Sequence, residues 1–129
     1  MSEKFTIEIV SPEKSIIKTE TSEVVIPSFE GEMGILKDHT PLITFLRPGL
    51  INIKDRSEQK FFVEEGTVEF SNNNLLILTS TAVELTKMNK KITDTLISES
   101  EKKLDNNEIS DKERYLLSYK LETLRNIRQ

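Results

Sequence analysis

Residues 50–78 read LINIKDRSEQKFFVEEGTVEFSNNNLLIL, a stretch in which short apolar runs alternate with polar turns. The runs at 50–54 and 60–63 flank one polar loop, and those at 66–70 and 75–78 flank a turn of three asparagines. Short runs in which every second residue is apolar are typical of half-buried β-strands, and asparagine tolerates the left-handed backbone of tight turns. The stretch therefore predicts two β-hairpins.

The same pattern continues on both sides of this stretch. Further short strands are expected at residues 5–10, 15–18, 23–26, 34–36, 42–46 and 82–85. Pro12 and Pro27 are expected to end strands, because proline lacks the backbone N–H that a sheet needs. Arg47-Pro48-Gly49 matches a type II turn, which favours proline followed by glycine. Nine or ten strands at spacings of roughly ten residues predict a β-sandwich.

The composition changes toward the C-terminus. All four prolines and all four glycines lie in the first 66 residues, and the last phenylalanine is Phe70. Residues 1–87 carry a net charge of −5, whereas residues 88–129 carry +1. We therefore expect two parts: a β-sandwich domain over residues 1–87 and a helical domain over residues 88–129.

The second part is expected to form two helices joined by a short polar turn. The first helix carries a stripe at helical spacing that includes one small residue: Ile92, Leu96, Ser100 and Leu104. The second begins with a capping box from Ser110 to Glu113 and carries its own stripe: Leu117, Leu121 and Leu124. Tyr115 and Tyr119, four residues apart, are expected to pack on each other. Two helices with so short a connection predict an antiparallel hairpin.

Such a hairpin is marginally stable by itself. Each helix offers three or four large apolar side chains, worth about 1.5–3 kcal/mol each when fully buried, and the ordering entropy of about 40 residues opposes them. We therefore expect the helices to dock on the strands or on a partner. A net docking energy of about a few kcal/mol would be small enough for a partner to reverse.

The composition excludes several classes of site. There is no cysteine, so disulfides and thiolate metal sites are excluded, and the single histidine excludes a site with two histidines in one chain. The net charge of −4, the pI near 5.2 and the mixing of lysines with acids argue against a nucleic-acid partner. No apolar run approaches the roughly 20 residues of a membrane span, and the N-terminus runs directly into a strand pattern without a signal-like segment.

Few residues are candidates for chemistry. His39 has no second histidine or cysteine to support it, and we interpret it as a surface or interface residue of a loop. Glu30-Gly31-Glu32 places two carboxylates on a glycine turn, which is either solvated or in contact with a basic surface. With no catalytic centre visible, the residues favour a binding or assembly role.

An ordered set of motifs carries a family resemblance. Along the chain the motifs are Ser11-Pro12-Glu13, Val25-Ile26-Pro27, the segment 30–36, His39-Thr40-Pro41-Leu42, Leu46-Arg47-Pro48-Gly49, the segment 62–70 and Leu76-Ile77-Leu78. Together they resemble the epsilon subunit of F-type ATP synthases, called delta in mitochondria. The resemblance covers residues 4–85, whereas the remaining residues match in pattern only.

This resemblance implies a ten-stranded β-sandwich followed by a helix–turn–helix, in a non-catalytic subunit of the central stalk. It implies that the chain binds the gamma subunit, rests on the ring of c subunits and couples rotation of that proton-driven ring to ATP synthesis. Glu30, Gly31 and Glu32 match the acidic turn that faces the polar loops of the c-ring. His39, Pro41 and Leu42 match the neighbouring segment near gamma and the ring.

The resemblance also implies a regulatory role for the hairpin. In many members the helices extend along gamma into the catalytic head and block ATP hydrolysis. Residues 110–128 as one helix would span about 28 Å. Lys120, Arg125 and Arg128 would then meet acidic surfaces of the alpha and beta subunits.

Two departures from the family pattern shape the remaining expectations. The usual Pro-Gly before the histidine is Lys37-Asp38 here. In whichever way residues 92–97 are aligned with an Ile-Asp-x-x-Arg motif, they do not provide both its Asp and its Arg. We therefore expect no bound ATP and no other cofactor. The absence of a transit peptide favours a peripheral location on the cytoplasmic face of a bacterial inner membrane. The alternative interpretation is a stand-alone β-sandwich adaptor or ligand-binding protein.

Overall fold

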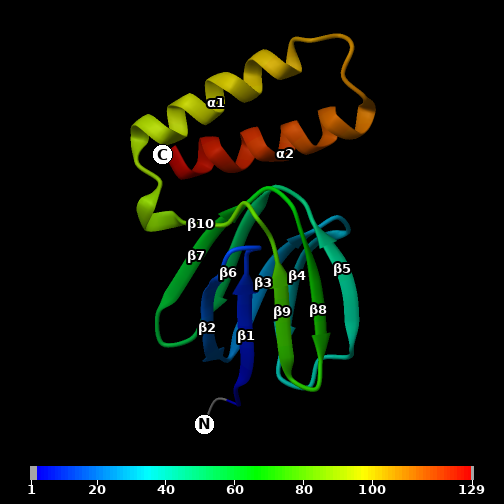
Figure 1. Ribbon diagram of the computed structural model, residues 1–129, viewed down its shortest axis with the longest axis vertical. Helices are drawn as coiled ribbons and strands as arrows, with labels where there is room; N and C mark the ends of the chain where they lie inside the picture. The colour runs from blue at the N-terminus through cyan, green and yellow to red at the C-terminus, as the bar shows by residue number, and fades with distance from the viewer. Residues whose placement is uncertain (1–2, 129) are drawn as a thin grey trace.

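The computed structural model describes residues 3–128 and shows a strand domain with a helical hairpin at one end (Figure 1). The strands are β1 (Phe5–Val10), β2 (Ser15–Thr21), β3 (Glu23–Ser28), β4 (Gly31–Leu36), β5 (Leu42–Leu46), β6 (Gly49–Lys54), β7 (Glu58–Val63), β8 (Gly66–Ser71), β9 (Asn74–Leu78) and β10 (Val83–Glu84). A 3₁₀ turn, η1 (Leu85–Lys87), leads to the helices α1 (Lys90–Leu104) and α2 (Asp111–Arg128).

The ten strands form one hydrogen-bonded sheet that curls into two facing halves. Its order is β10-β7-β6-β3-β5-β8-β9-β1-β2, and β4 pairs with β3 outside this path. The sheet turns at β3, whose first residues pair with β6 and whose last residue, Ser28, pairs with Leu46 of β5. All pairings are antiparallel except that of β1 with β9. The predicted β-sandwich is confirmed.

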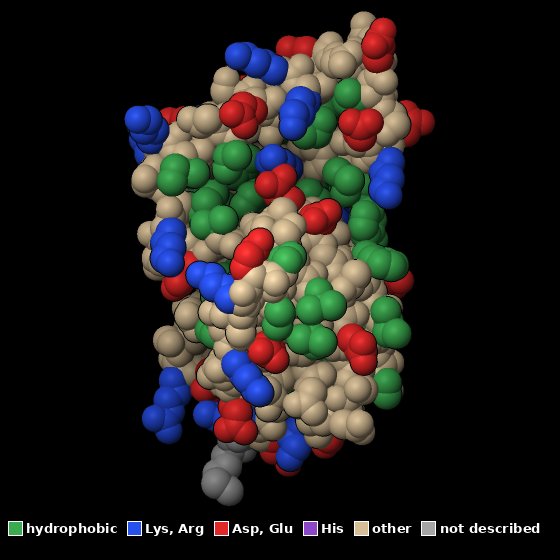
Figure 2. All heavy atoms as spheres, viewed as in Figure 1, with side chains coloured by type: hydrophobic (Ala, Val, Ile, Leu, Met, Phe, Trp, Pro, Cys, Tyr) green, Lys and Arg blue, Asp and Glu red, His purple; other side chains and the backbone are tan. Residues whose placement is uncertain are grey.

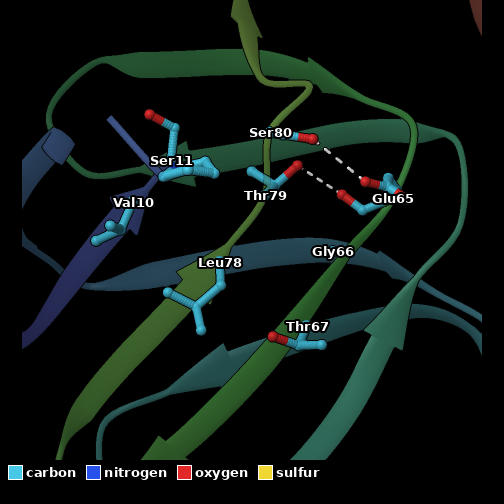
Figure 3. A pocket seen from close by; sticks show the side chains of 9 residues that line it. Val10, Ser11, Glu65, Gly66, Thr67, Leu78, Thr79 and Ser80 are labelled. Atoms are coloured by element: carbon cyan, nitrogen blue, oxygen red, sulfur yellow. Dashed lines mark hydrogen bonds between the residues drawn. The ribbon is translucent and has the colours of Figure 1, made fainter. Parts of the chain in front are cut away.

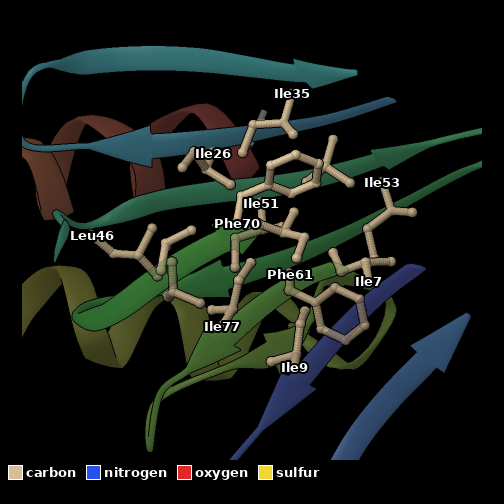
Figure 4. Close-up of a cluster of buried hydrophobic side chains, with 14 of the residues drawn as sticks. Ile7, Ile9, Ile26, Ile35, Leu46, Ile51, Ile53, Phe61, Phe70 and Ile77 are labelled. Atoms are coloured by element: carbon tan, nitrogen blue, oxygen red, sulfur yellow. The ribbon is translucent and has the colours of Figure 1, made fainter. Parts of the chain in front are cut away.

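The inward side chains of both halves form the core (Figure 4). In β1 and β6 every second residue is buried, as the alternation predicted. Phe5 and Phe70 meet edge to face in this core, with ring centroids 5.6 Å apart. Burial of large apolar side chains, at about 1.5–3 kcal/mol each, is the main force that holds the two halves together.

The helices dock on the strand domain, as their marginal stability led us to expect. A second apolar cluster joins Phe62 of β7 to Ile97, Leu121 and Leu124. The predicted cap of α2 is present, with the Glu113 amide donating to Ser110 Oγ at 3.1 Å. Asn89, which the sequence analysis did not single out, caps α1 by accepting from the Ile92 amide at 2.8 Å.

The predicted stripe of α1 is confirmed in part, since Ser100 is buried and Leu96 and Leu104 pack, partly buried, against the second cluster. Ile92 is 44% exposed, whereas Thr93, Ile97 and Ser100 are buried. The hairpin turn and the position of Phe62 set which side of α1 faces inward, and apolar spacing alone did not reveal this. Ser100 is buried as predicted, and its small side chain fits between the packed elements.

Two turn predictions in the strand region are also wrong. Pro27 lies inside β3, opposite Glu32 of β4, and does not end the strand. Gly49 begins β6 and does not have the positive φ of a type II turn. The glycine is needed for space instead, since a Cβ there would lie 2.6 Å from the Pro27 Cβ.

Candidate functional site

The segment Glu30-Gly31-Glu32, where β3 leads into β4, has a fixed geometry, and we call it the acidic turn. The buried Ser28 hydroxyl donates to the Gly31 carbonyl at 2.6 Å and accepts from the Glu30 amide at 3.2 Å. Gly31 has a φ of 122°, which side-chain-bearing residues rarely adopt. Glu30 and Glu32 are both exposed. The turn therefore presents negative charge to solvent from a rigid backbone.

The acidic turn contacts helix α2 through aromatic side chains. The Phe29 ring stacks on Tyr115, with centroids 6.0 Å apart and planes 8° apart, and the Tyr115 hydroxyl donates to the Phe29 carbonyl at 3.3 Å. Arg47 donates to the Tyr115 hydroxyl at 3.2 Å, and its Cζ lies 3.8 Å from the centroid of the Tyr119 ring. We call these four residues the aromatic latch.

Sequence reasoning predicted only part of the aromatic latch. Tyr115 and Tyr119 do contact each other, with centroids 4.9 Å apart, as their spacing suggested. Their contacts with Phe29 and Arg47 were missed. Phe29 and Tyr115 are separated by 86 positions, so no local pattern reports their contact.

The three cations expected to reach a partner are each engaged in an ion pair in the docked hairpin. Lys120 reaches Glu64 of the strand domain at 2.7 Å, and its side chain is only 13% exposed. Arg125 pairs with Glu101 at 2.8 Å, and Arg128 pairs with Asp94 at 3.4 Å. The first pair holds α2 to the strands, whereas the other two join α2 to α1.

The segment with His39, Pro41 and Leu42 lies at the other end of β4 from the acidic turn. A six-residue strand separates the two, a distance of about 20 Å. The ring of His39 meets Phe70 edge to face at 5.9 Å, and its Nδ1 lies 2.7 Å from the Thr40 carbonyl oxygen. The structure therefore does not bring these residues together with Glu30 and Glu32.

The unusual Lys37-Asp38 sequence is accommodated without glycine. Asp38 has a φ of 66°, a left-handed conformation that aspartate tolerates better than most residues. Its amide donates to Asn73 Oδ1 at 2.7 Å, and Asn73 Nδ2 donates back to Asp38 Oδ1 at 2.9 Å. These two bonds tie the β4–β5 loop to the β8–β9 turn.

An exposed apolar surface covers the outside of β5, β8 and β9. Phe45, Thr67 and Leu78 lie side by side in one row across these strands, and a second row contains Ile43, Glu69 and Leu76. Exposure reaches 77% for Ile43, 58% for Phe45 and 47% for Leu78. Figure 2 shows hydrophobic side chains gathered over this region. We call these six residues the outer face.

A groove of about 720 Å³ adjoins the outer face, and several of its polar groups are bonded to one another (Figure 3). The Thr79 hydroxyl donates to the Glu65 carbonyl at 2.6 Å, and the Ser80 hydroxyl donates to the Glu65 carboxylate at 3.3 Å. Among residues 3–128, no cluster of His, Cys, Asp or Glu could hold a metal ion.

Comparison with known proteins assigns the chain to a family. The family model described as ATP synthase, Delta/Epsilon chain, beta-sandwich domain matches residues 4–85. An ATP synthase epsilon chain of Pelagibacter ubique is 46% identical over 129 residues and covers 98% of this chain and 99% of the relative. One from Allorhizobium ampelinum is 34% identical and covers 98% of this chain and 91% of the relative.

Two solved structures share the fold. A chain in the mitochondrial ATP synthase of Euglena gracilis, solved as an OSCP/F1/c-ring assembly, has a TM-score of 0.75 at 19% identity and covers 95% of this chain and 78% of that one. A chain in the central stalk/c-ring of the Tetrahymena thermophila mitochondrial ATP synthase has a TM-score of 0.69 at 15% identity and covers 99% and 98%.

Proposed function

The chain belongs to the ATP synthase delta/epsilon chain family, and from this premise we propose that it is a central-stalk subunit that couples rotation of a proton-driven c-ring to ATP synthesis. Members of this family are non-catalytic subunits, and the roles of the individual surfaces are our inference. In this proposal residues 1–87 bind the rotor, and residues 88–129 regulate ATP hydrolysis.

The outer face is the proposed contact with the gamma subunit. Its three exposed apolar side chains are Ile43 and Phe45 on β5 and Leu78 on β9, with Thr67 and Glu69 of β8 between the two strands. Monomeric proteins rarely leave large contiguous apolar patches uncovered, so such a surface indicates a protein partner. This uncovered patch on a chain of a multisubunit-complex family is the observation that carries the proposal.

The acidic turn is the proposed contact with the c-ring. Glu30 and Glu32 offer two exposed carboxylates on a backbone fixed by Ser28 and Gly31. Such a turn suits basic groups in the polar loops of a membrane ring. The Debye length is about 10 Å at 0.1 M salt and shortens as salt is added, so attraction between these exposed charges should weaken with salt. His39, Pro41 and Leu42 are proposed to lie near gamma and the ring.

The hairpin is proposed to inhibit hydrolysis when it leaves the strand domain. Lys120, Arg125 and Arg128 would then exchange their present carboxylate partners for acidic surfaces of the alpha and beta subunits.

The location follows from the proposed partners. Neither described helix is both long and apolar enough to cross a membrane. We propose that the chain associates peripherally, through gamma and the c-ring, with the cytoplasmic face of a bacterial inner membrane. The bacterial origin of its similar relatives supports this placement.

Co-purification from the native organism tests the function. Tagged wild-type chain should recover gamma and c subunits, and Phe45→Asp should lose gamma. The matched control is Leu36→Asp, which puts the same charge at an exposed leucine outside the outer face. Glu30→Gln combined with Glu32→Gln should weaken recovery of the c-ring at low salt. If wild type recovers neither subunit, the chain is better described as a stand-alone adaptor.

A further inference from the structure

We propose that the aromatic latch couples the acidic turn to the hairpin, so that a basic partner loop bound at the turn favours the docked hairpin. The inference rests on the proposed function, which assigns the acidic turn to the c-ring. It adds that binding at the turn and docking of α2 are linked equilibria.

The contacts of Phe29 provide the link. Phe29 lies between Ser28, which fixes the turn, and Glu30, which carries its charge. One residue of α2, Tyr115, contacts both its ring and its carbonyl, and Arg47 donates to the Tyr115 hydroxyl. Release of α2 therefore removes the stacking partner of Phe29 and the donor to its carbonyl in one step.

A cleft beside the aromatic latch indicates that a bound partner would favour the docked hairpin over the released one. It has a volume of about 390 Å³ and lies between the strand domain and α2. Glu32 lines it from the strand domain and Glu122 lines it from α2, and Arg47, whose guanidinium lies against Tyr119, lines it as well. A basic side chain that enters the cleft meets two carboxylates against one guanidinium, and it meets both carboxylates only while the hairpin is docked.

Linkage makes the effect reciprocal. If a partner binds the docked state more tightly, then docking raises the affinity of the partner by the same factor. An aromatic pair contributes about 0.5–1.5 kcal/mol beyond its buried area, which corresponds to a change of about two- to tenfold in the opening equilibrium. The expected coupling therefore lies in this range.

A double-mutant cycle on the isolated full chain tests the latch itself. We would measure hydrogen-exchange protection of α2 amides and of the Glu30 amide in Phe29→Ala, Tyr115→Ala and the double variant. Each single change should lower α2 protection about two- to tenfold, and the double variant should be no worse than Tyr115→Ala alone. Leu36→Ala, an exposed leucine away from α2, should change nothing. Additive losses, or no loss, would overturn the latch.

A second experiment adds purified c-ring in detergent as the probe. Protection of α2 in wild type should rise when the ring is added, and Tyr115→Ala should bind the ring about two- to tenfold more weakly. Ring binding that leaves α2 protection unchanged would overturn the coupling. If the ring does not bind wild type at all, the proposed function is contradicted, and the double-mutant cycle still decides whether the latch couples turn and hairpin.

Discussion

At the scale of single residues, Gly49 illustrates a position fixed by close packing. It follows the Arg47–Pro48 link that carries the chain from β5 to β6, and Pro27 of β3 packs directly against it. The Arg47 guanidinium reaches Tyr119 from this same link. Because Gly49 lets the connection between β5 and β6 lie close to β3, it also helps to position Arg47 of the aromatic latch.

Substitution of Gly49 by alanine is expected to destabilise the fold. The added Cβ would lie 2.6 Å from the Pro27 Cβ, and neither group can rotate away. Overpacking of this kind costs about 1–3 kcal/mol. Denaturant unfolding measures the loss. Gly34→Ala is the matched control, because its nearest atom is the mobile tip of Glu23 at 3.4 Å. Equal stability of the two variants would contradict the packing argument.

A surface ion pair gives the fold a pH dependence. The side-chain hydrogen bond from Lys4 to Asp55, at 3.1 Å, lowers the pKa of Asp55 below its ordinary value of 3.8. Because the folded-state pKa is below the unfolded value, the pair stabilises the fold above the unfolded pKa. This contribution is lost as the pH falls through the folded-state pKa.

Lys4→Gln is therefore expected to be less stable than wild type at pH 7, and the difference should disappear as the pH falls below 3.8. Lys4→Arg keeps the charge and should retain the pH dependence. Denaturant midpoints measured from pH 2 to 7 check the prediction, and a difference that persists at the lowest pH would refute it.

At the scale of elements, the hairpin depends on a small cluster. Its buried apolar contacts with the strand domain centre on Phe62, and Leu124 is completely buried there. This cluster is distinct from the core between the two halves of the sheet. Docking and folding of the strands can therefore respond separately to mutation.

Leu124→Ala should release the hairpin and leave the strands folded. Large-to-small changes at buried sites cost about 2–5 kcal/mol, which is comparable to the docking energy of about a few kcal/mol expected for the helices. Hydrogen exchange should show lost protection in α1 and α2 and retained protection in β1, β6 and β8. Ile92→Ala, at an exposed site, should leave the helices protected. Loss of protection in the strands as well would show that the two clusters fold as one unit.

At the scale of the whole molecule, the proposed c-ring contact and the hairpin lie at the same end of the sandwich. The hairpin, the aromatic latch and the acidic turn lie at one end of the sandwich, and the start of β1 lies at the other (Figure 1). The outer face occupies one side between them. The proposed rotor contacts are thus carried by strands, and the proposed regulatory contacts by helices.

Deletion of residues 88–129 is expected to raise ATP hydrolysis by the assembled synthase, since it removes the helices proposed to enter the catalytic head. ATPase activity of complexes with full-length and truncated chain measures the effect. The truncated chain also exposes Phe62, which is 2% exposed in the docked structure, so its assembly into the complex must be verified. Unchanged hydrolysis in a fully assembled complex would count against inhibition by the hairpin.

The sequence alone predicted those features that depend on neighbouring residues. Alternation in β1 and β6, the capping box at Ser110 and the buried stripe of α2 were all visible, because side-chain direction follows the period of the local backbone. The acidic turn was visible in part, since its glycine and carboxylates are adjacent, but Gly31 and Glu32 already belong to β4.

Only the tertiary structure determined which distant residues meet. It paired Phe29 with Tyr115 and Lys120 with Glu64, and it turned Thr93 inward where the spacing favoured Ile92. The local chain is compatible with several docking angles of a helix. The choice among them is made by how well the apolar side chains of the helices fit Phe62 and its neighbours, a property of surfaces that form only after the sheet has closed.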